Sequence, residues 1–281
     1  MLTSYATLHR QVSALERDLR QLRLTREASI HPRRSPIDIA TALGIGLDRW
    51  QRDALTTEKR DILLLVSRQG GKGLVAAMLA LTALIEDAGS TTIIISKTER
   101  QAKRLVRRIR RYYHNLPNVP PILTEGQLAM ELRNGSEILA LPGSEENIRG
   151  IESVDLLISD EAALIPDSLF FSVRPTLAVS RGRSISLTTP RGRRGWFFHE
   201  FTSESDVYHR VMVTAYDIPR IDPEWLEEER NRIGNFWFSQ EFLCEFLDDE
   251  DQLFASEHID AALVERVGPL ALPMFGMGET A

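Results

Sequence analysis

The stretch of sequence that decides the fold reads Ile62-Leu63-Leu64-Leu65-Val66-Ser67-Arg68-Gln69-Gly70-Gly71-Lys72-Gly73. Its first five residues are apolar and predict a buried strand, and the apolar residues after Gly73 predict a helix. A glycine-rich turn between a strand and a helix aims backbone N–H groups at one point, where the helix N-terminus also favours an anion. We therefore predict a phosphate-binding loop in which Lys72 reaches the β and γ phosphates of a nucleotide. The loop residues predicted to bind the nucleotide are Ser67, Arg68, Gln69, Gly70, Gly71, Lys72 and Gly73.

This loop departs from the usual G-x-x-x-x-G-K-[ST] pattern at two positions. Val66 stands where the first glycine is expected, and Gly73 stands where a serine or threonine hydroxyl normally ligates Mg²⁺. Taken alone, the motif is equally compatible with a glycine turn that only joins a strand to a helix.

A second motif, Val154-Asp155-Leu156-Leu157-Ile158-Ser159-Asp160-Glu161, predicts a strand that ends in two adjacent carboxylates. Asp160 can hold Mg²⁺ through water, and Glu161 can orient and deprotonate an attacking water molecule. A lone acidic pair is more often a strand end that faces solvent. The two motifs in this order favour ATP hydrolysis, because each supplies what the other lacks.

Length and composition fit one large α/β domain with appendages. The chain has 281 residues and 31.8 kDa, and its 43% hydrophobic and 26% charged residues give no sign of disorder or of a fibre. The longest apolar stretch, residues 74–85, is too short to span a bilayer, and we see no secretory signal. The single cysteine, Cys244, fits a reducing cytoplasm and is expected to serve packing. We therefore expect a soluble protein that does not enter a membrane.

Charge is distributed unevenly along the chain. The net charge of -6 argues mildly against a protein that coats nucleic acid. However, residues 97–111 and 181–194 are rich in arginine and lysine, whereas acidic residues gather between 224 and 251. This pattern favours one face for a polyanion and another for protein contacts.

We expect three regions along the chain. Residues 1–36 predict an amphipathic helix followed by a linker rich in proline and arginine, 37–220 the nucleotide-binding core, and 221–281 a helical subdomain or linker. Apolar residues between positions 5 and 22 alternate at spacings of three and four, which fits either a short coiled-coil seam or a helix docked on its own domain. A coiled-coil seam would allow this helix to pair with a partner protein or with the same helix of a second copy.

Further elements follow from local patterns. Helices are expected within 37–55, 98–113 and 223–246, and strands at 91–96, 184–190 and 207–213. Asn134-Gly135 predicts a hairpin over 128–141, which we expect to be an insertion that decorates the sheet. Trp50 and Gln51 could stack on adenine and hydrogen-bond to it, although a core tryptophan and a surface glutamine are the simpler interpretation. Thr188 and Thr189 end a strand where they could sense the γ-phosphate.

Four segments in this order, SRQGGKG, VDLLISDEAALI, SLTTPRGRRGWFF and FSQEFLCEFLDD, resemble the ATPase domain of the large terminase subunits of tailed bacteriophages. Upstream, LDRWQRDAL resembles the adenine motif of that family, so the likeness runs from about Leu47 to Phe254. The resemblance implies a RecA-like, additional-strand (ASCE) P-loop ATPase with a mainly parallel central sheet flanked by helices. It also implies a motor that packages double-stranded DNA into a procapsid through a portal.

The resemblance implies roles for individual residues. Gln51, with Trp50 beside it, would contact adenine, and Lys72 would contact the phosphates of ATP. Asp160 would hold Mg²⁺, Glu161 would be the catalytic carboxylate, and Arg68 would stabilise transition-state charge. Thr188 and Thr189 match the coupling motif of the family, which links the nucleotide state to DNA movement. Arg149 matches a further family position, whose role stays open.

Partners also follow from the resemblance. They are double-stranded DNA, the portal protein, a small terminase subunit and further copies in a portal-bound ring, in the bacterial cytoplasm and transiently at the procapsid. An arginine that acts on a neighbouring subunit cannot be chosen from the sequence among Arg104, Arg107, Arg108 and Arg110. A solvated basic helix face is an equally good explanation of those four residues.

The chain departs from full-length members of this family after Phe254. Full-length terminases continue into a nuclease domain, and the residues after Phe254 are too few for one, so we expect no nuclease activity in this chain. The chain would then be either a motor-only form or a truncated product.

Two rival functions remain. The first is a helicase or remodelling ATPase, for which no second set of core motifs is visible, and the second is a silent nucleotide-binding scaffold with a decayed loop. The presence of Lys72, Asp160 and Glu161 argues against decay.

Overall fold

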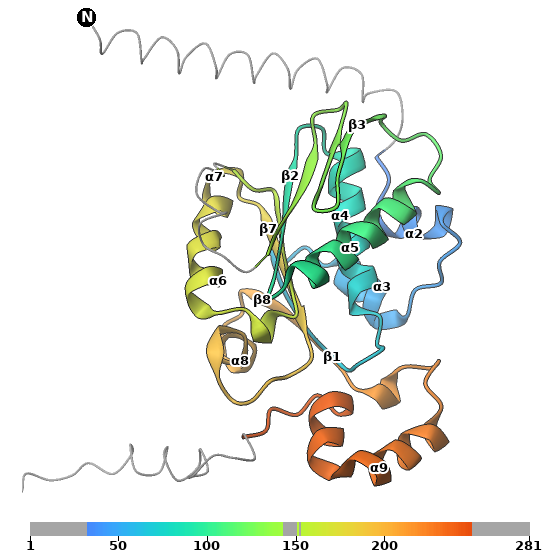
Figure 1. Ribbon diagram of the computed structural model, residues 1–281, viewed down its shortest axis with the longest axis vertical. Coiled ribbons are helices and arrows are strands. Elements are labelled where there is room, and N and C mark those ends of the chain that lie inside the picture. Colours follow the sequence, from blue (N-terminus) through green and yellow to red (C-terminus); the bar gives the residue numbers. More distant parts are fainter. Residues whose placement is uncertain (1–32, 143–150, 152, 249–281) are drawn as a thin grey trace, which may run out of the picture.

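The computed structural model describes residues 33–142, 151 and 153–248. Among these residues, eight strands form one sheet in the order β3-β4-β5-β2-β6-β7-β1-β8, with helices on both of its faces (Figure 1). The strands are β1 Asp61–Val66, β2 Thr91–Ser96, β3 Ile122–Glu125, β4 Ala129–Leu132, β5 Glu137–Pro142, β6 Leu156–Asp160, β7 Arg183–Thr188 and β8 Tyr208–Val213. The longer helices are α2 Pro36–Ala42, α3 Arg49–Thr56, α4 Lys72–Glu86, α5 Glu99–Tyr113, α6 Asp167–Val173, α7 Leu177–Ser180, α8 Gly195–Thr202 and α9 Pro223–Phe242. The predicted N-terminal amphipathic helix, which covers residues 1–27 of the region 1–36, lies outside the described residues, and so does Arg149.

The order of the strands confirms the predicted additional-strand α/β fold. β7 pairs in parallel with both β1 and β6, so one strand separates the strand before the glycine loop from the strand that ends in Asp160. All neighbours from β5 to β8 run parallel, and their carboxyl ends therefore meet at one edge of the sheet.

Alternation of side chains along the strands divides the core into two layers. In β1, Ile62, Leu64 and Val66 pack against the α2 to α5 face, whereas Leu63 and Leu65 pack against the face that α6 and α8 cover. Because successive side chains point to opposite faces, a continuous apolar strand fills both layers at once. Figure 1 shows these helices on the two sides of the sheet.

The predicted hairpin is confirmed, but one of its strands belongs to the central sheet. β4 and β5 pair antiparallel on either side of Gly135, which has φ +82°. We expected an insertion that decorates the sheet, but β5 pairs with β2 along its whole length and so extends the central sheet. Asn134 fixes the turn by donating its side-chain N–H to the Leu84 carbonyl at 3.0 Å.

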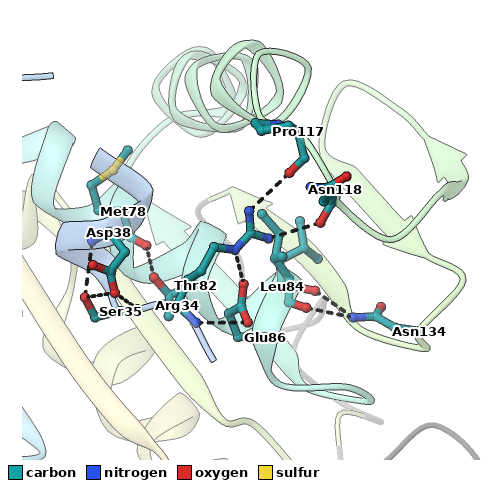
Figure 2. A network of polar contacts seen from close by, with 11 residues as sticks. Arg34, Ser35, Asp38, Met78, Thr82, Leu84, Glu86, Pro117, Asn118 and Asn134 are labelled. Atoms are coloured by element: carbon teal, nitrogen blue, oxygen red, sulfur yellow. Dashed lines mark hydrogen bonds and ion pairs between the residues drawn. The ribbon is translucent and has the colours of Figure 1, made fainter. Parts of the chain in front are cut away.

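The chain enters the domain through a polar network at the end of α4 (Figure 2). Arg34 donates from Nε to Glu86 Oε1 at 2.7 Å and from Nη1 to the Pro117 carbonyl at 3.2 Å. Ser35 caps α2 and Pro36 is its first helical residue, so the linker predicted up to residue 36 ends earlier. Proline is favoured there because the first N–H of a helix needs no intrahelical partner.

Two predictions for the C-terminal region are refined. The helix expected over 223–246 ends at Phe242 and is interrupted at Gly234, whose φ is +81°. Cys244 is 2% exposed, as its packing role required, and burial raises the pKa of its thiol to about 12. In the described part of the chain, no helix is both long and apolar enough for a membrane span.

Candidate active site

The two motifs meet at the carboxyl edge of the sheet, where ligands bind in open α/β folds. The glycine loop joins β1 to α4, and β6 delivers Asp160 and Glu161 to the same cleft. The cleft encloses about 280 Å³. Its lining residues are Gln69, Gly70, Gly71, Lys72, Gly73, Gln101, Arg104, Leu105, Arg108, Asp160 and Glu161.

The loop reaches its shape through left-handed backbone conformations. Gly71 is the N-cap of α4 at φ +95°, and Gln69 lies at φ +60°. Gly70 packs closely on Val66, since a Cβ at position 70 would lie 2.4 Å from Val66 Cγ1. The valine in place of the usual first glycine is therefore accommodated by the absence of a side chain at Gly70.

Lys72 and Glu161 face one another across the cleft. Nζ of Lys72 lies 3.7 Å from Oε1 of Glu161, and the two side chains are 14% and 28% exposed. Glu161 itself has φ +54°, a strained conformation for a residue other than glycine and one that occurs often at functional sites. The structure thus brings the cation of the first motif to the acid of the second.

Asp160 is held where its charge is unfavourable. Burial, and then the neighbouring charge of Glu161, raise the pKa of Asp160 to about 6, while the charge of Lys72 opposes that rise. A cation at this point would offset both effects, so the residues fit a bound Mg²⁺. The described residues contain no cluster of three or more His, Cys, Asp or Glu suited to a metal. One carboxylate, phosphate oxygens and water are nevertheless the usual ligands of Mg²⁺ at nucleotide sites.

Arg220 supports the loop from the segment before α9, and sequence reasoning missed it. Its Nη1 lies 2.6 Å from Asp48 Oδ2, and its Nη2 donates to the Gly70 carbonyl. A Cβ at Gly71 would lie 2.9 Å from Arg220 Nη2 and 2.8 Å from Gln51 Nε2. No local pattern marks Arg220, because its partners come from distant parts of the chain.

Trp50 and Gln51 lie beside the loop, but neither lines the cleft. Gln51 is 2% exposed, and its side-chain oxygen accepts a hydrogen bond from the Asp48 N–H at 2.9 Å. Trp50 packs partly buried against the core on the α4 side. Their contact with adenine stays a prediction, and the structure shows Gln51 capping the start of α3 with its Nε2 close to Gly71.

Ser67 and Arg68 belong to the loop but lie outside the cleft. Ser67 is fully buried. Arg68 turns toward α9, where its Nη2 lies 3.2 Å from Glu241 Oε1 and its backbone N–H donates to the Glu241 carbonyl at 3.1 Å. The α9 region is thereby tied directly to the glycine loop.

Thr188 connects the ends of β6 and β7. Its hydroxyl donates to the Thr189 carbonyl at 2.6 Å and accepts the Ala163 N–H at 3.3 Å, two residues after Glu161. Neither threonine lines the cleft, so a role in sensing phosphate stays a prediction. Thr188 ends β7, the strand that lies between β1 and β6.

The structure separates the four arginines of α5 that the sequence left equivalent. Arg104 and Arg108 line the cleft. Arg110 instead donates to the Gly126 carbonyl at 2.8 Å and pairs with Glu125 at 3.3 Å. Arg107 lies along a second hollow of the same helix with Glu99, Arg100 and Lys103, and Arg104 lines this hollow as well as the cleft.

A glycine loop before α4, an acidic strand end and one strand between them together define a RecA-like P-loop nucleotide-binding fold. The family model described as "Terminase large subunit, T4likevirus-type, N-terminal" matches residues 63–260. The chain therefore belongs to the terminase large subunit family and carries the N-terminal part that this model describes.

Curated relatives and solved structures agree with this assignment. The terminase large subunit of Thermus phage G20c is 26% identical over 237 residues, which are 71% of this chain and 48% of that protein. That of Escherichia phage T5 is 30% identical over 132 residues, 44% of this chain and 30% of that protein. The chain thus spans about half the length of the Thermus phage relative.

Two solved structures show the same fold. The large terminase ATPase domain of Thermus phage P74-26 has a TM-score of 0.66 at 24% identity and covers 77% of this chain and all of that one (100%). The large terminase of a thermophilic bacteriophage, solved in complex with ADP, has a TM-score of 0.62 at 16% identity and covers 72% of this chain and 54% of that one.

Proposed function

We propose that the chain is an ATP-hydrolysing motor domain that drives double-stranded DNA into a phage procapsid. The observation that carries the proposal is the approach of Lys72 and Glu161 to 3.7 Å inside one cleft, with Asp160 beside them. In the family to which the chain belongs, such an arrangement is the expected site of ATP binding and hydrolysis.

The residues of the cleft divide the work of hydrolysis. Lys72 and the N–H groups at the start of α4 bind the phosphates, because both present positive charge to an anion. Glu161 orients the attacking water and takes its proton. Mg²⁺, held through Asp160, would neutralise charge on the phosphates when ATP is bound. Arg68 would have to break its ion pair with Glu241 before it could reach the phosphates. This exchange of partners would couple α9 to the nucleotide.

Binding through Lys72 is tested by measuring Mg²⁺-dependent phosphate release and the Kd of ATPγS for the wild-type chain and Lys72→Ala. We expect Lys72→Ala to weaken ATPγS binding by about tenfold or more and to abolish turnover, because a charged hydrogen bond contributes roughly 1.5–3 kcal/mol. Lys59→Ala removes an exposed lysine outside the cleft and is the matched control. Unchanged binding and turnover in Lys72→Ala would refute the proposed function.

We further propose that the exposed cations of α5 contact the DNA backbone. One hollow along this helix is lined by Arg100, Lys103 and Arg107. Nζ of Lys103 also forms an ion pair with Oε1 of Glu99 at 2.5 Å. Phosphate contacts of this kind hold DNA without reading its sequence. The portal, a small terminase subunit and ring assembly in the bacterial cytoplasm remain proposals from family membership.

DNA affinity should therefore depend steeply on salt. We expect the Kd for linear double-stranded DNA to weaken by about ten- to hundredfold between roughly 50 and 200 mM salt, because bound phosphates release counterions. Arg107→Ala should reduce the slope by about one, whereas Arg232→Ala on α9, 70% exposed, should leave it unchanged. Fluorescence anisotropy over a salt series measures both, and an affinity that is flat across that range would contradict the proposal.

A helicase-type ATPase and a silent scaffold remain the alternatives. Duplex unwinding by the chain would favour the first, and ATPγS binding without turnover, even with DNA and portal present, would favour the second. The absence of nuclease activity from these 281 residues stays a prediction.

A further inference from the structure

Gly73 is the position where P-loop sequences usually carry a serine or threonine. In this structure an arginine from another helix fills the space that such a side chain would need. A Cβ at Gly73 would lie 2.5 Å from Nη1 of Arg108 and 3.6 Å from its Cζ. A side chain at position 73 would therefore require the Arg108 guanidinium to move away from its present place.

Arg108 lines the cleft with a charge that no described residue pairs, as Arg104 does, and of the two it is Arg108 that reaches Gly73. Among the described residues Arg108 makes no hydrogen bond or ion pair, whereas Arg110 is held by Gly126 and Glu125. The helix itself is fixed, because Leu105 and Ile109 on either side of Arg108 are buried in the core. The packed helix thus anchors the Arg108 side chain at the cleft, and its guanidinium is free to take a ligand.

The cleft around Arg108 offers anions as its natural ligands. The guanidinium lies in the same cavity as Lys72 and the glycine loop, and its positive charge slightly opposes the rise in the pKa of Asp160 that burial causes. Guanidinium groups bind phosphate oxygens with two parallel hydrogen bonds, a geometry that a hydroxyl cannot match.

We propose that Arg108 replaces the missing loop hydroxyl and binds the phosphates of the nucleotide directly, within its own subunit. This inference rests on the proposed function and adds to it a phosphate ligand from α5. In other P-loop sites the serine or threonine hydroxyl helps to hold Mg²⁺, and Mg²⁺ neutralises the phosphates. Here the guanidinium of Arg108 would supply part of that positive charge. Nucleotide binding should therefore depend on Mg²⁺ less than in a loop with serine or threonine.

The test is the Kd of ATPγS and of ADP by titration calorimetry, once with Mg²⁺ and once with EDTA. We expect Arg108→Ala to weaken binding about ten- to hundredfold in EDTA and clearly less in Mg²⁺. Arg111→Ala is the matched control, since Arg111 belongs to the same helix but is exposed and does not line the cleft; its Kd should change by less than about twofold.

A second pair of variants tests the conflict between Arg108 and a side chain at position 73. Gly73→Ser should weaken binding in the wild-type background, because its Cβ meets Arg108. The same change in an Arg108→Ala background should instead improve binding in Mg²⁺ and leave the EDTA value unchanged, because the hydroxyl can then support the metal. A merely structural role for Arg108 would not produce this reversal of sign.

The outcomes separate the two proposals. Equal Kd values for wild type and Arg108→Ala in EDTA, together with lost binding in Lys72→Ala, would overturn the inference and leave the proposed function intact. Retained binding and turnover in Lys72→Ala would refute the proposed function itself. Arg108→Gln, which keeps most of the side-chain volume, replaces Arg108→Ala if circular dichroism shows that the alanine variant is misfolded.

Discussion

Glu161→Gln is expected to lower the rate of ATP hydrolysis by about 10²- to 10⁴-fold, the usual contribution of a general base. The amide keeps the size of the side chain but cannot accept the proton of the attacking water. It also removes a negative charge that lies 3.7 Å from Lys72, so the affinity for ATPγS should be equal or higher. Steady-state phosphate release and ATPγS titration measure the two effects.

Glu245→Gln provides the control for this result, because Glu245 is exposed and lies outside the cleft. It should hydrolyse ATP at the wild-type rate. A Glu161→Gln variant that keeps more than about a tenth of wild-type turnover would show that another group takes the proton.

Trp196→Ala should cost about 3–5 kcal/mol in the free energy of unfolding, as do other truncations of large buried aromatics. Trp196 is 2% exposed and stacks on Phe170 with ring centroids 3.5 Å apart. Its indole N–H donates to the Ile165 carbonyl at 3.1 Å, so the alanine variant also leaves that buried carbonyl without its partner. Urea or guanidinium unfolding of the full chain measures the loss.

Trp237→Ala is the matched comparison, since this tryptophan is 44% exposed and its nearest aromatic contact is edge-on with Phe236. We expect it to cost at most about 1 kcal/mol. Similar losses at the two positions would mean that the layer between α6 and α8 contributes less to stability than its burial indicates.

Local patterns predicted the frame of the molecule well. The apolar run of β1, the glycine turn and the run that ends in Asp160 each predicted an element of the correct type, and Asn134-Gly135 marked the hairpin. These signals are readable because strand burial and turn geometry are set by neighbours in sequence. The part that β5 plays in the central sheet was not readable, because the pairing of distant strands leaves no local signal.

The candidate site was only partly predictable. Gln69 to Gly73, Asp160 and Glu161 do line one cleft, as the two motifs together indicated. Arg68, assigned to the same site, faces Glu241 instead, and the four α5 arginines were indistinguishable by sequence. Their separation depends on the direction in which a packed helix presents each side chain, and a basic run does not encode it.

The sequence by itself determined that a glycine loop and an acidic strand end would share one edge of a parallel sheet. Hydrophobic periodicity and the convergence of parallel strands are enough for that conclusion. Only the tertiary structure decided which groups lie against Gly71 and Gly73 and that Arg104 and Arg108 are the α5 arginines that line the cleft. Those answers depend on contacts of Arg108, Gln51 and Arg220 with the loop, and close packing brings these groups together from distant parts of the chain.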